Sequence, residues 1–393
     1  MRVFIIAGEP SGDKLGGALM AGLRSLQPEI EFRGIGAEHM ATQGLQSRFD
    51  MRELSVMGLA EILPKYRALQ ARIRETADAV VAWAPDVLIT IDAPDFSLRV
   101  ARRVKAQSAV RTVHYVAPSV WAWRPGRAAK MAQVIDQVLA LLPFEPPFMT
   151  AHGMRCDFVG HPVVAEPVAT AAEAEDFRAA HGIGAGPLVA VLPGSRQAEV
   201  RRLAPVFGAA LGVLAQRQPG LRVVVPAAAA VADAVAAAVR GWPVEAILVD
   251  PRTPGAEAQK RAAVAAADAA LAASGTVSLE LAAAGTPMVI AYDMNRLSLK
   301  LITWMMRIDT VTLVNLVSES RTVPEFIGAA CTPEAVAGGL LAVLDAPEAQ
   351  RQAMALTMQR LGQGGEAPGL RAARAVLADL AQTPGQGASG GDI

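Results

Sequence analysis

Residues 1–13 read MRVFIIAGEPSGD and contain the pattern from which the fold class follows. A short apolar run ends at Ala7, a turn rich in Gly, Pro and Ser follows, and leucines then recur at helical spacing at positions 15, 19, 23 and 26. A buried strand, a tight loop and an amphipathic helix together form the first repeat of a parallel α/β sheet. Such sheets bind ligands beyond the carboxyl ends of their strands, so the loop at 8–13 is a candidate site.

The same alternation of strands and helices continues along the rest of the chain. Six strands are expected in the first part of the chain, at 3–7, 31–35, 87–91, 112–116, 138–142 and 158–159. A segment rich in Pro, Ala, Thr and Glu at 162–175 is typical of an interdomain linker. The alternation then restarts, with strands expected at 188–192, 223–225, 246–249, 269–272 and 288–291. The sequence therefore predicts an α/β fold with two Rossmann-like doubly wound domains.

Composition narrows the class of protein. The 393 residues hold 37 Lys plus Arg and 37 Asp plus Glu, and this zero net charge disfavours a nucleic-acid partner. Cys156 and Cys331 match no metal or redox spacing. No uninterrupted apolar run reaches the ~18 residues of a membrane-spanning helix, and no signal peptide is evident. We therefore expect a cytoplasmic protein.

Two carboxylates of the first domain follow expected strands. Glu9 lies in the GEPSGD turn, and Asp92 comes directly after the strand at 87–91. A carboxylate held at a strand end can act as a general base toward a hydroxyl group. The alternatives are helix caps, with Ser11 or Asp13 capping the first helix and Asp95 capping the next. Asp92 and Asp95 stand three apart without a further acidic cluster, so no metal site is expected.

A third loop of the first domain is aromatic. Residues 114–124 read HYVAPSVWAWR and contain Trp121, Trp123 and Arg124. Aromatic rings and a guanidinium suit stacking on a sugar and contact with an anion, although buried tryptophans more often pack in cores. His114 fits a structural role as well as a catalytic one.

Two loops of the second domain are suited to a diphosphate. Gly194, Ser195 and Arg196 follow one expected strand, and Ser274, Gly275 and Thr276 follow another. Small residues expose backbone N–H groups, and a guanidinium adds charge-assisted hydrogen bonds to phosphate. Glu280, about a turn into the next helix, could accept the two hydroxyls of a ribose. The alternative for the second loop is an ordinary helix cap.

One segment combines apolar and basic residues. An apolar stripe is followed by Arg67, Arg72 and Arg74. Such a stripe is usually core, yet its basic neighbours also fit an interfacial helix or an acyl-chain groove. The candidate lipid-binding residues are Val56, Met57, Leu59, Ile62, Leu63 and Tyr66.

Taken together, the motifs resemble the lipid-A-disaccharide synthase family. Eight of them fall in that family's order across most of residues 1–330. They are GEPSGD at 8–13, VMGLAEILP at 56–64, IDAPDF at 91–96, HYVAPSVWAWR at 114–124, LLPFE at 141–145, FVGHP at 158–162, LPGSR at 192–196 and SGTVSLE at 274–280.

The resemblance implies the glycosyltransferase B architecture, in which two domains face a cleft. The expected parts are an acceptor and lipid-binding domain at 1–165, a nucleotide-sugar domain at 166–345, helices at 346–382 that cross back to the first domain, and a disordered tail at 383–393. The oligomeric state stays open.

It also implies an inverting transfer from UDP-2,3-diacylglucosamine to 2,3-diacylglucosamine 1-phosphate, which yields a β(1→6) disaccharide and UDP without a cofactor or metal. Asp92 and Glu9 would face the acceptor hydroxyl. Asn315, preceded here by Val314 where the family has Pro, would join the nucleotide residues, and Glu325 is a weaker candidate from the same region. The acylated substrates place the protein at the cytoplasmic surface of the inner membrane, as a peripheral protein.

Three other classes of protein remain open on the residues alone. A different UDP-sugar-dependent enzyme, either a two-domain glycosyltransferase or a 2-epimerase, would not need the segment at 56–74. A non-catalytic nucleotide-binding module would leave Glu9 and Asp92 without a role. A nicotinamide dehydrogenase would need a GxGxxG turn after the first strand, which Gly8-Glu9-Pro10 does not provide.

Overall fold

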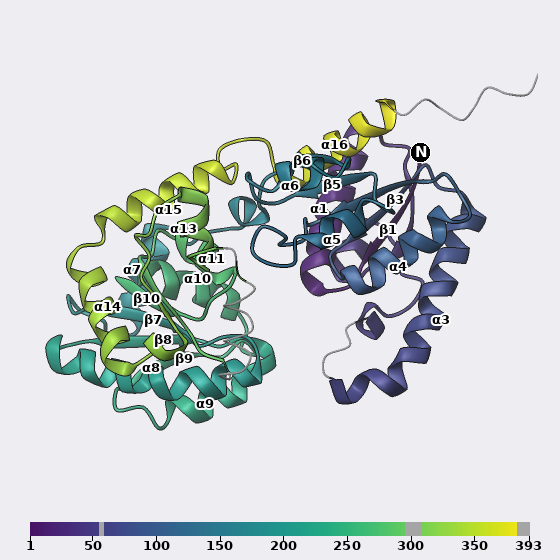
Figure 1. Ribbon diagram of the computed structural model, residues 1–393. Coiled ribbons are helices and arrows are strands. Elements are labelled where there is room, and N and C mark those ends of the chain that lie inside the picture. Colours follow the sequence, from purple (N-terminus) through teal and green to yellow (C-terminus); the bar gives the residue numbers. More distant parts are fainter. Residues whose placement is uncertain (55–58, 295–305, 307, 383–393) are drawn as a thin grey trace, which may run out of the picture. The chain divides into compact units, whose positions relative to one another are not determined.

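A computed structural model describes residues 1–54, 59–294, 306 and 308–382, and the side chains of all of these except 59–66. The chain forms two compact units. The first comprises Met1–Ala165 and the C-terminal segment that begins at Gly364, and the second comprises Glu166–Gln363. Each unit is built around one parallel six-stranded sheet covered by helices (Figure 1).

The sheet of the first unit has the strand order β2-β1-β3-β4-β5-β6, with every pair parallel. Its central strands are mostly apolar and buried almost throughout, because helices cover the sheet on either side. The strands are β1 (Arg2–Ala7), β2 (Glu31–Ile35), β3 (Val87–Ile91), β4 (Arg111–Tyr115), β5 (Gln137–Ala140) and β6 (Arg155–Phe158).

The helices of the first unit follow the strands in alternation. They are α1 (Pro10–Leu26), α2 (Glu38–Ala41), α3 (Leu59–Trp83), α4 (Pro94–Lys105), α5 (Gly126–Met131), α6 (Pro146–Thr150) and α16 (Pro368–Gln382), with 3₁₀ turns η1 (Met51–Leu54) and η2 (Pro162–Ala165). The last of them, α16, packs along α1 although more than three hundred residues of chain separate the two. A Cβ on Gly22 would lie 2.6 Å from the Gly369 carbonyl oxygen, so the two backbones touch.

The sheet of the second unit has the order β12-β11-β10-β7-β8-β9 and is also parallel. Numbered within the unit, this order is that of the dinucleotide-binding Rossmann fold, with its switch point between β7 and β10. The strands are β7 (Leu188–Leu192), β8 (Arg222–Pro226), β9 (Ala246–Val249), β10 (Ala269–Ala272), β11 (Met288–Tyr292) and β12 (Glu325–Ile327).

Helices, several of them Ala-rich, make up much of the rest of the second unit. They are α7 (Ala171–Ala180), α8 (Gln197–Arg217), α9 (Ala232–Val239), α10 (Ala256–Ala266), α11 (Val277–Ala283), α13 (Leu313–Ser318), α14 (Pro333–Asp345) and α15 (Glu348–Arg360), with 3₁₀ turns η3 (Ala229–Val231) and η4 (Gly328–Ala330). Gly208 on α8 shows how close the packing is, since a Cβ there would lie 2.3 Å from the Trp242 ring.

The predicted fold class is confirmed, and all eleven predicted strands are present within a few residues of their expected bounds. The sequence did not predict β12, which has three residues. The expected linker at 162–175 contains the start of α7, which the Thr170 and Glu173 side chains cap reciprocally. Among the described residues, no helix combines the length and apolarity that a membrane crossing needs.

The C-terminal helices depart from the expected bracing segment at 346–382. Helix α15 packs on α11 and α13 of the second unit, and only α16 packs on the first. The reason lies in polar contacts that hold α15 in place. Gln350 bonds the backbone of Met288, and the Arg360 guanidinium donates to the Val317 carbonyl oxygen at 2.6 Å. The tail at 383–393 lies outside the described residues.

Candidate functional site

In the first unit, Glu9 and Asp92 follow neighbouring strands. Strands β1 and β3 pair in parallel up to Ala7 and Ile91. This pair is the switch point of the sheet, because the chain runs outward from it in opposite directions on either side. A Cβ on Gly8 would lie 2.4 Å from the Ala93 Cβ atom, so the two loops are in contact. The structure therefore brings the Glu9 loop and the Asp92 loop together.

The backbone at Asp92 is strained. Asp92 and Ala93 have φ angles of 51° and 43°, in the left-handed region that residues other than glycine rarely adopt. Each such residue costs on the order of 1–3 kcal/mol and persists only where its surroundings hold it. Here the Asp92 N–H donates to the Tyr115 carbonyl oxygen at 3.1 Å, and the Ser97 hydroxyl donates to the Asp92 carbonyl oxygen at 2.8 Å. The carboxylate of this strained residue is half-buried.

The alternative capping roles in these loops are not observed. Glu9 occupies the N-cap position of α1, and neither Ser11 nor Asp13 caps that helix. Asp13 is 2% exposed, and its carboxylate accepts from the backbone N–H groups of the next turn of chain, at residues 37, 39 and 40. Asp95 is exposed in the first turn of α4, whose N-cap is Ala93. Asp13 therefore fixes the entry to α2, and Asp95 supports the α4 dipole only.

The aromatic loop after β4 is anchored by a carboxylate that the sequence did not single out. The Trp121 Nε1–H donates to Glu145 Oε1 at 3.2 Å, and the Trp121 ring meets Phe144 edge-on at 5.1 Å. Glu145 is 4% exposed, and burial raises its pKa to about 7 against the opposing pull of its N–H donors. The Arg124 guanidinium lies over the Trp123 ring at 4.4 Å. Glu145 and Phe144 thus hold Trp121, whereas Trp123 and Arg124 stack on each other.

His114 is a structural histidine. It is 2% exposed, and its Nδ1 lies 2.8 Å from the Thr90 hydroxyl on the neighbouring strand. Burial lowers its pKa to about 4, so the ring is neutral at physiological pH. It belongs to the core of the sheet.

In the second unit, the two candidate loops also flank the switch point. Strands β7 and β10 pair up to Leu192 and Ala272. Gly194-Ser195-Arg196 follows β7, and Ser274-Gly275-Thr276 follows β10. Gly275 and Thr276 are exposed, and a Cβ on Gly275 would meet no atom within 4 Å. Helix α11 has seven residues, so open backbone N–H groups rather than a long helix dipole would attract an anion there.

The first of these loops is held by Glu199, which the sequence analysis missed. Its Oε2 accepts from the Ser195 and Arg196 N–H groups at 3.1 and 3.3 Å, and its Oε1 accepts from Arg196 Nη1 at 3.1 Å. Gly194 has a φ of 113°, and a Cβ there would lie 2.6 Å from Glu199 Oε2. A Glu three residues into a helix is the usual partner of a capping box, and that spacing was the available signal.

Glu280 is paired with a lysine. Lys260 Nζ on α10 donates to Glu280 Oε2 on α11 at 2.9 Å. Both side chains are partly exposed, at 34% and 42%. Lys260 lies inside an Ala-rich helix, and no sequence pattern marked it.

Asn315, a candidate nucleotide residue, makes hydrogen bonds within its own region of the chain. Its side chain is 1% exposed and bonds Thr310 Oγ1 together with both the N–H and the carbonyl oxygen of Val323. Glu325 Oε1 accepts from Thr310 Oγ1, and from the N–H groups of Val311 and Thr312. These two side chains shape the backbone at 310–312, and the nucleotide role of Asn315 stays a prediction.

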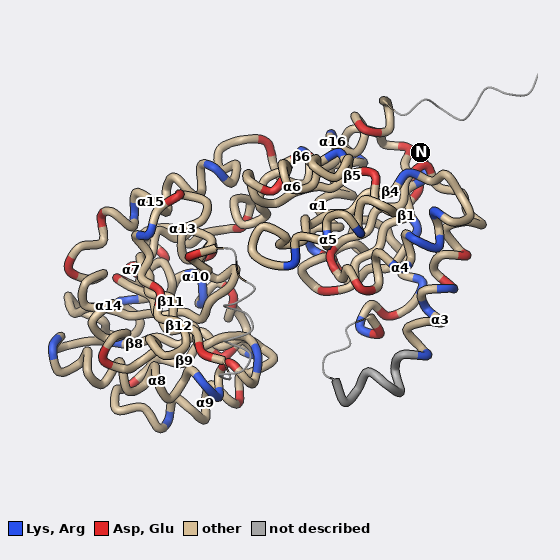
Figure 2. The backbone as a smooth tube through the Cα atoms, in the orientation of Figure 1, with Lys and Arg blue, Asp and Glu red and all other residues tan. Residues whose placement is uncertain are grey.

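The candidate lipid-binding residues are only partly described. Val56 and Met57 lie outside the described residues, as do the side chains of Leu59, Ile62, Leu63 and Tyr66. Figure 2 shows basic residues along α3 and α4. Of the arginines that follow the stripe, Arg72 is engaged within the unit, because it pairs with Glu53 and Glu75 at 2.8 Å.

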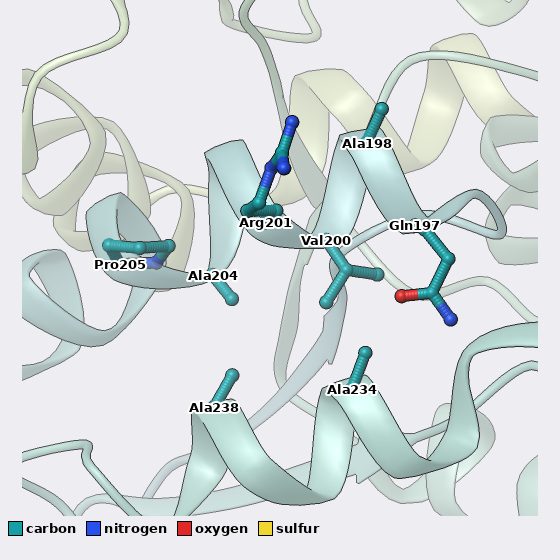
Figure 3. Close-up of a pocket in the computed structure, with 8 residues that line it drawn as sticks. All are labelled: Gln197, Ala198, Val200, Arg201, Ala204, Pro205, Ala234 and Ala238. Carbon is teal, nitrogen blue, oxygen red and sulfur yellow. The ribbon is translucent and has the colours of Figure 1, made fainter.

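A pocket of about 560 Å³ lies between α8 and α9. Figure 3 shows Val200 and Ala204 on one helix facing Ala234 and Ala238 on the other. None of the candidate nucleotide residues lines it, and Gln197, next to Arg196, marks its end. The pocket is therefore separate from the two strand-end loops. Within the described ranges, no group of three or more His, Cys, Asp or Glu side chains is arranged to hold a metal ion.

Comparisons with solved structures define the class of the fold. The chain resembles UDP-GlcNAc 2-epimerase from Neisseria meningitidis, with a TM-score of 0.61 and 11% identity over 97% of this chain and 100% of that one. It resembles Acinetobacter baumannii MurG with a TM-score of 0.53 and 14% identity over 97% and 99%. Two doubly wound domains with strand-end loops at both switch points define the glycosyltransferase B class of fold.

Sequence comparisons then define the family. The family model described as lipid-A-disaccharide synthetase matches residues 3–376. The lipid-A-disaccharide synthase of Ruegeria pomeroyi is 66% identical over 380 residues, which cover 96% of this chain and 95% of that protein. The synthase of Rhodospirillum centenum is 49% identical over 383 residues, which cover 96% and 94%. The chain belongs to the lipid-A-disaccharide synthetase family.

Proposed function

We propose that the chain is an inverting glycosyltransferase that joins UDP-2,3-diacylglucosamine to 2,3-diacylglucosamine 1-phosphate, with a β(1→6) disaccharide 1-phosphate and UDP as products. Family membership over nearly the whole chain supports the reaction. The observation that carries the mechanism is the strained, half-buried Asp92 at the switch point of the first sheet. Strain of this kind concentrates at functional sites, because the fold must hold the residue in place.

Asp92 is the proposed general base. It takes the proton from the acceptor's 6-hydroxyl as that oxygen attacks the anomeric carbon, and the bond to the UDP oxygen breaks on the opposite face. Glu9, on the loop in contact with Ala93, is proposed to orient the acceptor sugar. A positioned base contributes roughly 10²–10⁴ in rate. Trp121, Trp123 and Arg124, beyond β4 in the same unit, are proposed to contact the acceptor's sugar and phosphate.

The second unit is proposed to bind the nucleotide. Arg196 and the backbone N–H groups of Gly194, Ser195, Ser274, Gly275 and Thr276 receive the negative charge that develops on the departing diphosphate. Each preorganised donor of this sort is worth about 3–4 kcal/mol of transition-state stabilisation. Glu280 accepts the ribose hydroxyls. Solved proteins that share this fold include a UDP-GlcNAc 2-epimerase bound to UDP-GlcNAc, which supports a UDP-sugar donor.

A peripheral association with the cytoplasmic face of the inner membrane completes the proposal. The apolar residues at 56–66 are proposed to bind acyl chains, at about 0.8 kcal/mol per buried methylene. Leu59→Glu with Leu63→Glu should weaken sedimentation with anionic vesicles without lowering the melting temperature. The control is Leu248→Glu with Leu356→Glu, two exposed leucines of the second unit. Unfolding of the Leu59, Leu63 variant, or equal loss in the control, would count against a lipid role.

The reaction itself is tested by product analysis. The purified protein is incubated with both substrates in the presence of EDTA, and the products are identified by mass spectrometry. We expect disaccharide 1-phosphate and UDP in equal amounts, and none of either when the acceptor is omitted. A change in the donor alone, such as an epimerised UDP-sugar, would instead favour the 2-epimerase alternative.

A further inference from the structure

The ion pair between Lys260 and Glu280 ties a residue of the proposed nucleotide site to a neighbouring helix. Lys260 lies on α10, and Glu280 lies on α11, directly after the Ser274-Gly275-Thr276 loop. The ammonium donates to Oε2 at 2.9 Å, and within the described part of the chain Oε1 has no hydrogen bond. One carboxylate oxygen is thus held from the protein side, while the other can still accept hydrogen bonds.

Lys260 is surrounded by carboxylates. Burial lowers its pKa, but the contact with Glu280 and the nearby charges of Glu257 and Glu166 raise it, and the net result is a raised pKa. The ammonium is therefore charged at neutral pH. Glu280 accepts a hydrogen bond from this ammonium at 2.9 Å. Without the lysine, Glu280 would lose the cation that holds its Oε2 atom.

We propose that Lys260 is a positioning residue for the nucleotide's ribose: it holds Glu280 Oε2 so that Oε1 accepts the ribose hydroxyls. The inference rests on the proposed function, in which Glu280 contacts the ribose. A glutamate that is already held loses less side-chain freedom when the nucleotide binds, so its hydrogen bonds contribute more to affinity. Lys260 would therefore raise the affinity contributed by the ribose of the nucleotide. The diphosphate would be bound by the strand-end loops.

The test separates the ribose from the phosphates. Dissociation constants for UDP and 2′,3′-dideoxy-UDP are measured by calorimetry on the full chain and on three variants, Lys260→Met, Lys260→Arg and Glu280→Gln. We expect Lys260→Met to reduce the preference for UDP over the dideoxy nucleotide by about tenfold, since hydrogen bonds to charged groups are involved. Affinity for the dideoxy nucleotide should stay the same. Lys260→Arg should restore most of the preference, and Glu280→Gln should abolish it.

Two results would overturn the proposal. If Lys260→Met weakens both nucleotides equally, the lysine acts on the diphosphate or on the fold as a whole. If the preference for UDP is unchanged in Lys260→Met, or absent in the unmodified protein, Lys260 does not position a ribose-binding carboxylate. The disaccharide assay keeps these outcomes apart from a failure of the proposed function, because a protein that forms disaccharide yet ignores the ribose hydroxyls is still a transferase.

Discussion

The Arg196 guanidinium lies against the Glu199 carboxylate, with Nη1 3.1 Å from Oε1. The same carboxylate accepts the backbone N–H groups of Ser195 and Arg196 through Oε2. Glu199 is 12% exposed, whereas Arg196 is 67% exposed. Loop donors that are proposed to bind phosphate therefore contact a carboxylate of the protein itself. A diphosphate has to compete with Glu199 for Arg196.

This competition predicts the effect of Glu199→Gln. The amide oxygen can still accept from the Ser195 and Arg196 N–H groups, so the loop stays in place, but the charge that holds the guanidinium is gone. We expect UDP to bind about two- to fivefold more tightly, in line with the small free energy of an exposed ion pair. Calorimetry measures the dissociation constant. Weaker binding would mean that Glu199 presents Arg196 to the nucleotide rather than competing for it.

Arg196→Ala should lower kcat by about 10²–10³, because a charge-assisted donor to the leaving diphosphate is lost. The matched control is Arg201→Ala, which removes an exposed arginine of the same helix that lines the α8–α9 pocket. Steady-state kinetics on both variants decide the matter. Equal rates for the two variants would remove Arg196 from the proposed nucleotide site.

Asp379→Ala should destabilise the first unit. The Asp379 carboxylate is 4% exposed and accepts two hydrogen bonds from the Arg111 guanidinium, at 2.7 and 2.8 Å. Removing one partner of a buried pair leaves the other uncompensated, and since Arg111 is partly exposed we expect a loss of about 2–4 kcal/mol. Denaturant unfolding measures it. Glu366→Ala, which breaks the more exposed pair with Arg374, should cost less than about 1 kcal/mol. Similar losses would show that Asp379 does not anchor α16.

Glu145 should give stability a pH dependence that Glu145→Gln removes. Burial raises the pKa of Glu145 from 4.5 to about 7, so the folded chain holds this proton more tightly than the unfolded chain does. The contribution of Glu145 to stability is thus greatest below pH 4.5 and is lost as the pH rises to about 7. Thermal melts give the melting temperature of Glu145→Gln relative to that of the unmodified protein. This difference should shift in favour of the variant between pH 5 and pH 7.5.

The pH dependence of stability that comes from His114 has the opposite sign to that of Glu145 between pH 4 and pH 6.5. Its folded pKa is about 4, below the usual 6.5, so its contribution to stability is lost as the pH falls from 6.5 toward 4. Only the difference between the Glu145→Gln variant and the unmodified protein isolates the carboxyl group. A difference that does not change with pH would mean that Glu145 is already ionised in the folded protein.

The sequence predicted the elements of the fold better than their arrangement. Runs such as 188–192 and 269–272 are short, apolar and bounded by turns, so their strand character follows from local pattern alone. The pairing of β7 with β10 depends on contacts between residues far apart in the sequence. It explains why two loops about eighty residues apart flank one switch point. The short strand β12 escaped prediction because three residues carry too little periodicity.

The site divides in the same way. Asp92 was predicted from its place after a strand, but its left-handed backbone became visible only in the structure. Glu199 had a local signal, whereas the partners Lys260 and Glu280 are brought together by packing of two helices twenty residues apart. Asn315 was assigned by resemblance, and its hydrogen bonds to Thr310 and Val323 became visible only in the structure. The spacing of residues in the sequence does not reveal which partners a buried polar side chain bonds.

In our proposal, a carboxylate of the first unit takes the proton of the acceptor, while the second unit holds the nucleotide. Asp92→Asn tests it most directly, with Asp95→Asn, an exposed carboxylate three residues further along the same loop and helix start, as the matched control. We predict that Asp92→Asn lowers disaccharide formation at least about 10²-fold, leaves the dissociation constant for UDP unchanged, and that Asp95→Asn affects neither. Normal turnover by a folded Asp92→Asn protein would contradict the account.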